Sequence, residues 1–429
     1  MKHWFSDVPS FRRNQLQFFL DKAAESNEPA VRLRLGSKRL WLITGPDLAR
    51  TILKGEDRIA DKGFFIEKLR PIVGKSLLTI NGEENTRRRR AIHAGFSKGA
   101  AQQLVPEIAA TVREAAVELA KQDHFNVQDA MAQLTLRIAC VALFGKGVLT
   151  RGDENLVINA VRLVEEDVAT ELFRVVPAMP WQARAKQKRR AEARAMMQIV
   201  VNRVRDKAKD SSALRALIDL GLDDEAIRDE IVTMLIAGHH TTGAAATWIL
   251  YYMASLPELS NIMAEEAARL ASCSGEFNNE ALLSATKSQA LVKEVLRLFP
   301  SAHWFSRDAL MPLSAGSNTI KTGDSMIICP WQMHRDERHW PLASTFDTNR
   351  NFSSKAYLPF GAGPRACLGL VLANMTLQVI ALELASAFEF EVHGALPTPI
   401  PTGSVTLIPP TLVLRAHVRK PSSFALAAE

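Results

Sequence analysis

The most constraining feature of this sequence is a glycine-rich segment that ends in a single cysteine. Residues 360–369 read Phe-Gly-Ala-Gly-Pro-Arg-Ala-Cys-Leu-Gly, and a helix-like apolar run from Leu368 to Phe388 follows. Glycine adopts backbone angles closed to other residues and lets a flat ligand approach closely. Amides at a helix N-terminus favour the thiolate of Cys367, and Arg365 can lower its pKa or hold a ligand carboxylate. Such a loop suits a metal with one axial protein ligand, whereas an isolated cysteine would more often be inert and buried.

The composition indicates an ordinary soluble globule. The chain has 429 residues, of which 47% are hydrophobic, as in proteins with a large core. Its cysteines are scattered without a CxxC pair, which argues against a disulfide framework or structural zinc site and for a reducing compartment. The chain opens with no apolar stretch of signal-peptide length, and no run reaches the roughly 18 uncharged apolar residues of a membrane span. The four cysteines are Cys140, Cys273, Cys329 and Cys367.

The positive charge has one dense block. The formal net charge is +7, and residues 87–90 are four consecutive arginines. Such a run is usually a solvated face, and nucleic-acid binding is the next common interpretation. Aromatic residues are not interleaved with the arginines, so we expect no nucleic-acid partner.

The pattern along the chain predicts one mainly helical domain over residues 1–429 with a small β-rich lobe. Residues 31–35 and 40–44 read as a hairpin, and a helix is expected from Pro46 to about Leu53. Residues 83–390 are mostly helical in pattern. Short extended pieces are expected at 318–330 and 404–416.

The longest helix-like segment begins at the acidic run 222–225, which suits an N-cap and first turn, and continues to about Leu256 before Pro257. Roughly 32 residues would extend about 48 Å, enough to cross the molecule. Residues 237–243 read Ala-Gly-His-His-Thr-Thr-Gly. Small residues let a flat cofactor approach the backbone, and glycine beside threonine can open a helix into a local bulge.

Two charged motifs lie between that helix and the cysteine loop. Glu294 and Arg297 stand three positions apart in a helix predicted from Ala290 to Phe299, and alone they would form a surface ion pair worth about 0.3 kcal/mol. About 50 residues later, residues 346–350 read Phe-Asp-Thr-Asn-Arg. The order of these two motifs and the cysteine loop is specific.

Together these segments resemble the cytochrome P-450 (haem-thiolate monooxygenase) family of soluble bacterial type. Its haem-binding signature is Phe, Gly, any, Gly, any, Arg, any, Cys, any, Gly, and residues 360–369 match every fixed position. The resemblance implies a mainly α cytochrome P-450 fold, with a large helical region and a small β-rich lobe. It implies haem b (iron protoporphyrin IX) with Cys367 as the metal ligand. Glu294, Arg297 and Arg350 would form a buried triad that locks the following segment against the thiolate loop, although Thr348 stands where the family usually has proline.

The resemblance also implies ligands for the haem propionates, which are carboxylates that need cations. The family's early His-x-x-x-Arg pair aligns with Asn85 and Arg89, so asparagine replaces the histidine here. Arg307 and Arg365 are the further candidates, and Phe360 opens the loop beside the cofactor. The other arginines of the block, Arg87, Arg88 and Arg90, would point outward and steer an acidic electron donor, or form a plain solvated face.

On the oxygen side of the haem, the family has an acid followed by an alcohol, which deliver protons during oxygen activation. Thr241 matches the alcohol, but His240 occupies the place of the acid. Histidine can relay protons near neutral pH. Some members of the family, sterol demethylases among them, look similar at this position. Two alternatives remain open for His240: a hydrogen-bonded core residue, or a metal site with His239, although helix neighbours rarely share one ion.

By family analogy, the walls of the substrate pocket come from five places and are largely apolar, which favours a lipophilic substrate such as a fatty acid or terpenoid. Apolar stripes are more often core than pocket. Lys68 and Arg70 could hold a carboxylate at the mouth, but a solvent-facing role is favoured. The named pocket residues are Phe64, Phe65, Leu172, Phe173, Ala237, Trp304, Thr406 and Leu407.

The sequence therefore predicts a cytoplasmic bacterial monooxygenase, monomeric and without a membrane anchor, that inserts oxygen from O2 into a C–H bond. The chain shows no flavin-domain signature or ferredoxin cysteine cluster, so we expect electrons from a separate ferredoxin or flavodoxin-type donor with its reductase. Two alternatives are a peroxide-driven hydroxylase, against which Thr241 argues, and a non-catalytic haem sensor or carrier.

Overall fold

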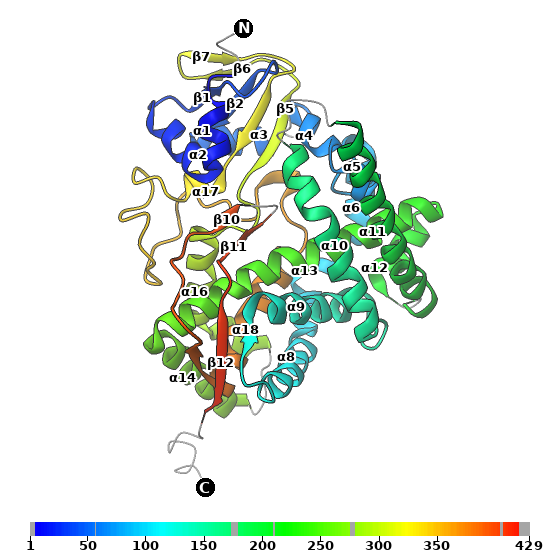
Figure 1. Cartoon of the computed structure of the whole chain (residues 1–429), viewed down its shortest axis with the longest axis vertical. Coiled ribbons are helices and arrows are strands. Elements are labelled where there is room, and N and C mark those ends of the chain that lie inside the picture. Colours follow the sequence, from blue (N-terminus) through cyan, green and yellow to red (C-terminus); the bar gives the residue numbers. More distant parts are fainter. Residues whose placement is uncertain are drawn as a thin grey trace.

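The computed structural model describes residues 5–55, 57–172, 179–208, 211–274, 279–403 and 406–419. A β-rich lobe with the N-terminal helices lies at one end, and a larger helical region fills the rest (Figure 1). This arrangement confirms the predicted mainly α fold with a small β-rich lobe. Pocket residue Phe173 lies outside the described residues, and the side chain of Leu172 lies outside them as well.

Helices make up most of the described chain. They are α1 (Val8–Arg13), α2 (Gln15–Ala24), α3 (Pro46–Lys54), α4 (Gly63–Glu67), α5 (Arg70–Val73), α6 (Gly82–Ile92), α7 (Lys98–Gln103), α8 (Val105–Leu119), α9 (Val127–Phe144), α10 (Arg151–Leu172), α11 (Pro180–Lys207), α12 (Ser212–Asp219), α13 (Asp224–Ser255), α14 (Pro257–Ser274), α15 (Asn279–Ser284), α16 (Thr286–Leu298), α17 (Pro330–Met333) and α18 (Leu370–Ala387), with short 3-10 helices at His93–Phe96 and Gly363–Arg365.

The strands form one larger sheet and three small ones. The order of the larger sheet is β1-β2-β8-β5-β3, in which β1 and β2 form the predicted hairpin and β2 runs parallel to β8. The strands are β1 (Ala30–Leu33), β2 (Leu40–Ile43), β3 (Ala60–Asp61), β4 (Phe125–Asn126), β5 (Phe305–Ala309), β6 (Leu313–Ala315), β7 (Asn318–Ile320), β8 (Ser325–Ile328), β9 (Phe388–Val392), β10 (Thr402–Gly403), β11 (Leu407–Ile408) and β12 (Val413–Val418).

The long central helix α13 organises the helical region. Its N-cap Asp223 accepts a hydrogen bond from the amide of Ala226 at 2.7 Å, as the acidic start of the segment predicts. The helix has 32 residues and passes through the middle of the molecule (Figure 1). Trp248 in its second half is fully buried and stacks on Phe299 with ring centroids 3.5 Å apart. α13 is therefore a core element on most sides.

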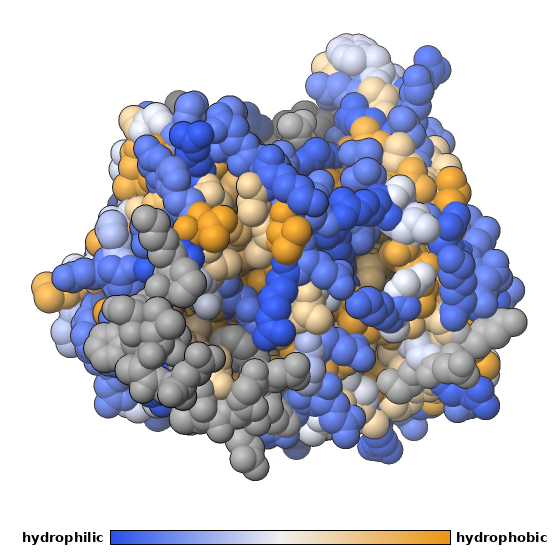
Figure 2. Space-filling view, turned by 90° about the horizontal axis from the view of Figure 1, so that it is seen from below, coloured by the Kyte–Doolittle hydropathy of each residue, from blue (hydrophilic) through white to orange (hydrophobic). Residues whose placement is uncertain are grey.

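Among the residues that the structure describes, two helices, α9 and α18, are long and apolar enough to cross a membrane by length and composition. More than half of each is buried inside the protein, which is typical of core helices in a soluble protein. Viewed from below, polar and charged side chains cover most of the coloured surface, with apolar ones in small groups between them (Figure 2). Neither helix is good evidence for a membrane span.

Candidate active site

The cysteine loop is a closed turn packed on helix α3. The amide of Cys367 donates to the carbonyl of Phe360 at 2.9 Å, which joins the two ends of the loop. Gly363 has φ +72°, and a Cβ atom there would lie 2.2 Å from the carbonyl oxygen of Leu53. Only glycine meets both conditions. Close packing on α3 therefore fixes the position of the thiol.

The thiol of Cys367 is accessible although protein atoms surround it. The residue is exposed, yet burial is the largest influence on its thiol and raises its pKa. The backbone N–H of Gly369 and the charge of Arg89 act in the opposite direction. The cation that lowers the pKa of this thiol is therefore Arg89, whereas the sequence pointed to Arg365. A bound metal cation would reverse this balance, because coordination deprotonates a thiol.

The four candidates for carboxylate binding occupy different surroundings. Arg89 donates to the carbonyl of Ala366, next to the cysteine. Arg365 binds both carboxylate oxygens of Asp57, each at 3.0 Å, through a side chain that is 3% exposed. Both arginines thus belong to the cysteine loop and its immediate support.

The other two candidates lie farther along the site. The side-chain amide of Asn85 donates to the carbonyls of Leu77 and Ile80 at 2.8 and 3.1 Å, so its nitrogen orders the preceding loop. Arg307 on β5 is 7% exposed and donates to the carbonyl of Ser306 at 2.7 Å. Asn85 therefore already has a structural task that the family's histidine pattern did not indicate.

The structure brings Glu294, Arg297 and Arg350 together. Nε of Arg297 lies 2.7 Å from Glu294 and Nε of Arg350 lies 3.1 Å from it. Arg297 also donates to the carbonyls of His334 and Ala343 at 2.8 and 2.6 Å. The network thus binds α16 to the irregular segment that leads to the cysteine loop, and Glu294 and Arg297 are fully buried.

The middle of α13 remains a regular helix and presents one open side. Ala237 is exposed, and the hydroxyl of Thr241 donates to the Ala237 carbonyl at 2.9 Å. Gly238 and Gly243 instead face α9, where added Cβ atoms would lie 3.1 Å from Ala139 and 3.0 Å from Thr135. The glycines therefore serve helix packing, and the sequence expectation that they open a bulge is wrong.

His240 has an acidic partner that the sequence did not reveal. Its Nε2 lies 3.4 Å from the carboxylate of Glu165 on α10, and its Nδ1 lies 3.4 Å from the hydroxyl of Thr406. Both His240 and Glu165 are partly exposed, with side-chain exposures of 19% and 21%. An acid therefore contacts the residue that precedes Thr241, although α13 carries none at position 240. Only the packing of α10 on α13 could reveal it.

The neighbouring His239 is a core residue. Its ring Nδ1 lies 2.7 Å from the carbonyl oxygen of Leu235, and the residue is 2% exposed. Burial lowers its pKa to about 4, so its ring is neutral at pH 7. The two histidines thus have different surroundings, and no group of three or more metal-ligating side chains occurs within the described chain.

Several predicted pocket residues are in mutual contact. Phe65 meets Trp304 edge-to-face with ring centroids 5.7 Å apart, and Phe64 meets Phe65 at 5.4 Å. Leu407 is fully buried, and its carbonyl accepts a hydrogen bond from the indole of Trp248 at 2.9 Å. Phe65 and Leu407 both belong to the hydrophobic core, and Trp304 packs against it. The Phe65–Trp304 and His240–Thr406 contacts join segments far apart in sequence.

The arginine block does not point uniformly outward. Arg88 is 7% exposed and binds Glu84 at 2.6 Å and Glu230 of α13 at 3.0 Å. The expectation that Arg88 faces solvent is therefore wrong, because a buried carboxylate of α13 requires its charge. Arg87 and Arg90 are exposed as predicted.

The structure thus contains a thiol held by a glycine loop and a long central helix with an alcohol on its open side. The family model that describes cytochrome P450 matches residues 3–415. This chain belongs to the cytochrome P450 family. It is accordingly an oxidoreductase, a haem-iron monooxygenase.

Known P450s from plants and bacteria align with nearly the whole chain. It is 27% identical to the chloroplastic protein LUTEIN DEFICIENT 5 of Arabidopsis thaliana over 87% of this chain and 69% of that protein. It is 28% identical to cyclooctat-9-en-7-ol 5-monooxygenase of Streptomyces melanosporofaciens, over 87% and 84% of the two chains. A putative cytochrome P450 132 of Mycobacterium tuberculosis is 25% identical, with 84% of each chain covered.

The residues present fit a haem group. Cys367 offers an accessible sulfur inside the protein, and Arg89 carries a cation beside it. Ala237 and Thr241 give α13 an open side in the middle of an otherwise buried helix. A flat macrocycle ligated by one thiolate requires this combination of ligand, cation and small side chains.

Proposed function

We propose that this P450 inserts one oxygen atom from O2 into a C–H bond of a lipophilic substrate, with haem b as cofactor and electrons from a separate protein. The single observation that carries the proposal is the thiol of Cys367, fixed by the glycine loop yet accessible within the protein. When bound, haem supplies the oxygen-activation chemistry, and thiolate ligation favours O–O cleavage.

In this proposal the side chains around the site divide the work. Cys367 ligates the iron, Phe360 closes the loop, and Arg89, Arg307 and Arg365 supply positive charge for the two carboxylates of the cofactor. Asn85 contributes by ordering the loop at residues 77–80. The triad of Glu294, Arg297 and Arg350 keeps the cysteine loop in place through the segment that it binds.

The groups on the open side of α13 would transfer protons. Thr241 carries a hydroxyl, and His240 carries an imidazole that contacts Glu165. A carboxylate beside an imidazole fixes the orientation of the ring. We propose that Glu165, His240 and Thr241 together do what an acid–alcohol pair on one helix does in other family members.

The pocket walls support a lipophilic substrate. Phe65 and Trp304 form an apolar wall, and Ala237 leaves room beside α13. Two of the relatives carry names that refer to cyclooctatin chemistry: cyclooctat-9-en-7-ol 5-monooxygenase and cyclooctatin synthase. Fatty acids and terpenoids are therefore the two substrate classes that we propose.

The electron donor would be a ferredoxin or flavodoxin with its reductase. Exposed Arg87 and Arg90 on α6 flank Arg89, which contacts the cysteine loop from the same helix. A basic surface next to the thiolate side of the cofactor would steer an acidic donor. We propose that the protein acts as a cytoplasmic monomer.

The absorbance of the dithionite-reduced, carbon-monoxide-bound protein tests the haem ligation. We expect a band at about 450 nm, because a thiolate ligand shifts the Soret transition. The variant Cys367→His should move this band to about 420 nm, whereas Cys329→Ser, which removes a buried thiol elsewhere, should leave it unchanged. A wild-type band at about 420 nm would refute Cys367 as the ligand.

A further inference from the structure

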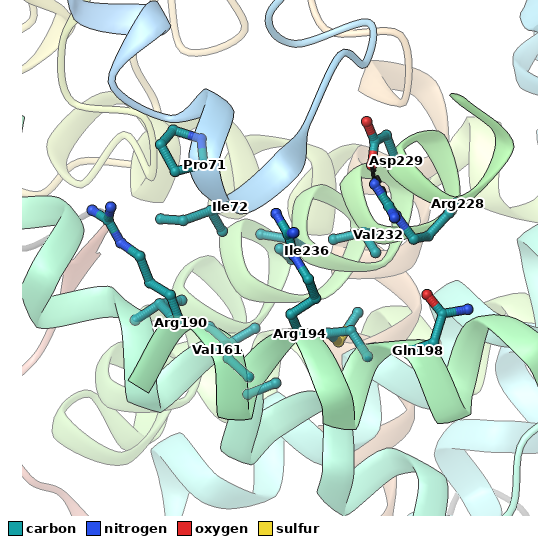
Figure 3. A pocket seen from close by; sticks show the side chains of 14 residues that line it. Pro71, Ile72, Val161, Arg190, Arg194, Gln198, Arg228, Asp229, Val232 and Ile236 are labelled. Carbon is teal, nitrogen blue, oxygen red and sulfur yellow. Dashed lines mark hydrogen bonds and ion pairs between the residues drawn. The ribbon is translucent and has the colours of Figure 1, made fainter. Parts of the chain in front are cut away.

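A groove that is lined by arginines and apolar side chains lies between helices α5, α10, α11 and α13. Its floor is apolar, and arginines stand at its rim (Figure 3). Ile236 at its inner end lies one helical turn before His240. The lining comes from α5, α10, α11 and α13: Pro71, Ile72, Ala160, Val161, Val164, Arg190, Ala193, Arg194, Met197, Gln198, Arg228, Asp229, Val232 and Ile236.

The arginines at the rim differ in their partners. Arg228 is neutralised locally, because its guanidinium lies 2.7 Å from Asp229 and 3.0 Å from Glu225. Within the described chain, no ion pair joins Arg190 or Arg194 to a carboxylate, and Nε of Arg190 is buried without a hydrogen-bond partner. The groove therefore keeps two uncompensated cations.

These two cations stand on the same face of one helix. Arg190 and Arg194 are four positions apart on α11, and both side chains rise toward the turn at Pro71 and Ile72 (Figure 3). Like charges at this spacing destabilise a helix. A buried, unsatisfied guanidinium nitrogen adds to the cost. An anion bound between them would relieve both penalties.

We propose that this groove binds a long-chain carboxylic acid, with the carboxylate on Arg190 and Arg194 and the chain along the apolar floor. The planar guanidinium fork matches a carboxylate in two hydrogen bonds. Val161, Val232 and Ile236 would cover the methylene groups and direct the chain toward the open side of α13. The inference rests on the proposed function in one respect, since it makes this acid the substrate.

The floor of the groove favours an alkyl chain. It is formed by aliphatic side chains, among them Val161, Val232 and Ile236, and an alkyl chain gains favourable free energy with each methylene group that leaves water. A carboxylate head and an alkyl tail therefore match both the charge and the apolar floor of the site.

Lys68 and Arg70, the other cations that could hold a carboxylate, have partners outside the groove. The ammonium of Lys68 lies 4.5 Å from the ring centroid of Phe64, and Arg70 pairs with Glu67 at 2.9 Å. Neither residue lines the groove. The carboxylate anchor is therefore assigned to α11.

Calorimetric titration of the ferric holoprotein with laurate and with 1-dodecanol tests the site. The two probes share a chain and differ in charge. We expect R190Q/R194Q to weaken laurate binding at least tenfold and to leave dodecanol binding unchanged. The matched control R184Q/K188Q removes the same charge at the same spacing from exposed positions of α11 outside the groove, and should leave both probes unaffected.

Three outcomes would overturn the inference: unchanged laurate affinity, an equal loss for dodecanol, or an equal loss in the control variant. If R190Q/R194Q does not fold, R194Q alone tests the same contact, because Arg194 is exposed. Calorimetry needs no turnover, so a carbon-monoxide band at about 420 nm together with arginine-dependent laurate binding would refute the proposed function and leave the groove intact. Tight laurate binding without the laurate-induced Soret shift expected of a substrate would refute only its role as substrate.

Discussion

At the scale of single residues, the alcohol and the acid that we propose for proton transfer lie on different helices. Thr241 lies on the open side of α13, and His240 beside it contacts Glu165 of α10 at 3.4 Å. In the proposed relay, Glu165 and His240 are thus 75 residues apart in sequence. This division makes separate predictions for the hydroxyl and for the carboxylate.

The variant Thr241→Ala should separate electron consumption from product formation. General acid–base groups contribute roughly 10²–10⁴ to a rate, so we expect product formed per electron pair to fall at least tenfold while electron uptake continues. The measurement compares product with reduced cofactor consumed and peroxide released. Thr241→Ser keeps the hydroxyl and should retain coupling; unchanged coupling in Thr241→Ala would place the relay elsewhere.

The variant Glu165→Gln should act through His240. The side chain keeps its size but loses its charge, so the orientation of the ring is no longer fixed by a carboxylate. We expect coupling to fall severalfold, and the same substitution in a His240→Gln background to have no further effect. A double-mutant cycle on urea unfolding should also give an interaction of about 0.2–1 kcal/mol between the two residues. Additive effects in both measurements would show that Glu165 acts independently.

At the scale of elements, the buried triad connects helix α16 to the cysteine loop. Glu294 accepts from Arg297 and Arg350 and from the amide of Asp347, the last at 2.8 Å. His334 continues the chain of contacts, because the amide of Leu358, two residues before Phe360, donates to its Nε2 at 2.9 Å. A substitution in the triad should therefore perturb the cysteine loop.

We expect Glu294→Gln to destabilise the protein by about 3–5 kcal/mol, because it leaves two buried guanidinium groups without a charged partner. Urea unfolding of the ferric protein, with haem content measured in parallel, checks this value. Glu258→Gln, at an exposed position of α14, removes the same charge and should change stability by less than about 0.5 kcal/mol. If Glu294→Gln changed stability as little as Glu258→Gln, the triad would contribute no more to stability than an ordinary surface ion pair.

Local sequence motifs predict the cysteine loop and its support, whereas the other side chains of the site depend on packing between elements far apart in sequence. The cysteine loop, the triad and α13 could be predicted because each is a short pattern with fixed spacing. Gly238, Gly243 and Arg88 could not be assigned correctly, because their roles depend on α9 and on Glu230, which spacing does not place beside them. The same limit hid Glu165.

At the scale of the whole molecule, three histidines are buried in the neutral form in separate parts of the fold. They are His239 on α13, His303 after α16, and His334 after α17. Burial lowers the pKa of His239 and His303 to about 4 and that of His334 to about 3. All three must gain a proton when the chain unfolds in mild acid.

The sign of the resulting pH dependence follows from these directions. An unfolded histidine has a pKa of about 6.5, so the folded state is favoured fully above that pH and loses stability as the pH falls toward the folded values near 3–4. Each histidine contributes a slope of about 1.4 kcal/mol per pH unit once its unfolded form is protonated. His334 offers the clearest test, because the Leu358 amide donates to Nε2, which leaves Nδ1 protonated and 2.9 Å from the carbonyl oxygen of Arg297.

Glutamine can donate and accept as neutral imidazole does but does not titrate, so His334→Gln should reduce the pH slope of the unfolding free energy by about 1.4 kcal/mol per pH unit between pH 6 and 4.5. Urea titrations of the ferric wild type and variant across this range measure the difference. The exposed His93→Gln serves as the control, because it makes the same substitution outside the buried core. Parallel pH profiles for wild type and His334→Gln would mean that His334 accepts a proton within the fold. The contact that joins α16 to the cysteine loop would then depend on pH.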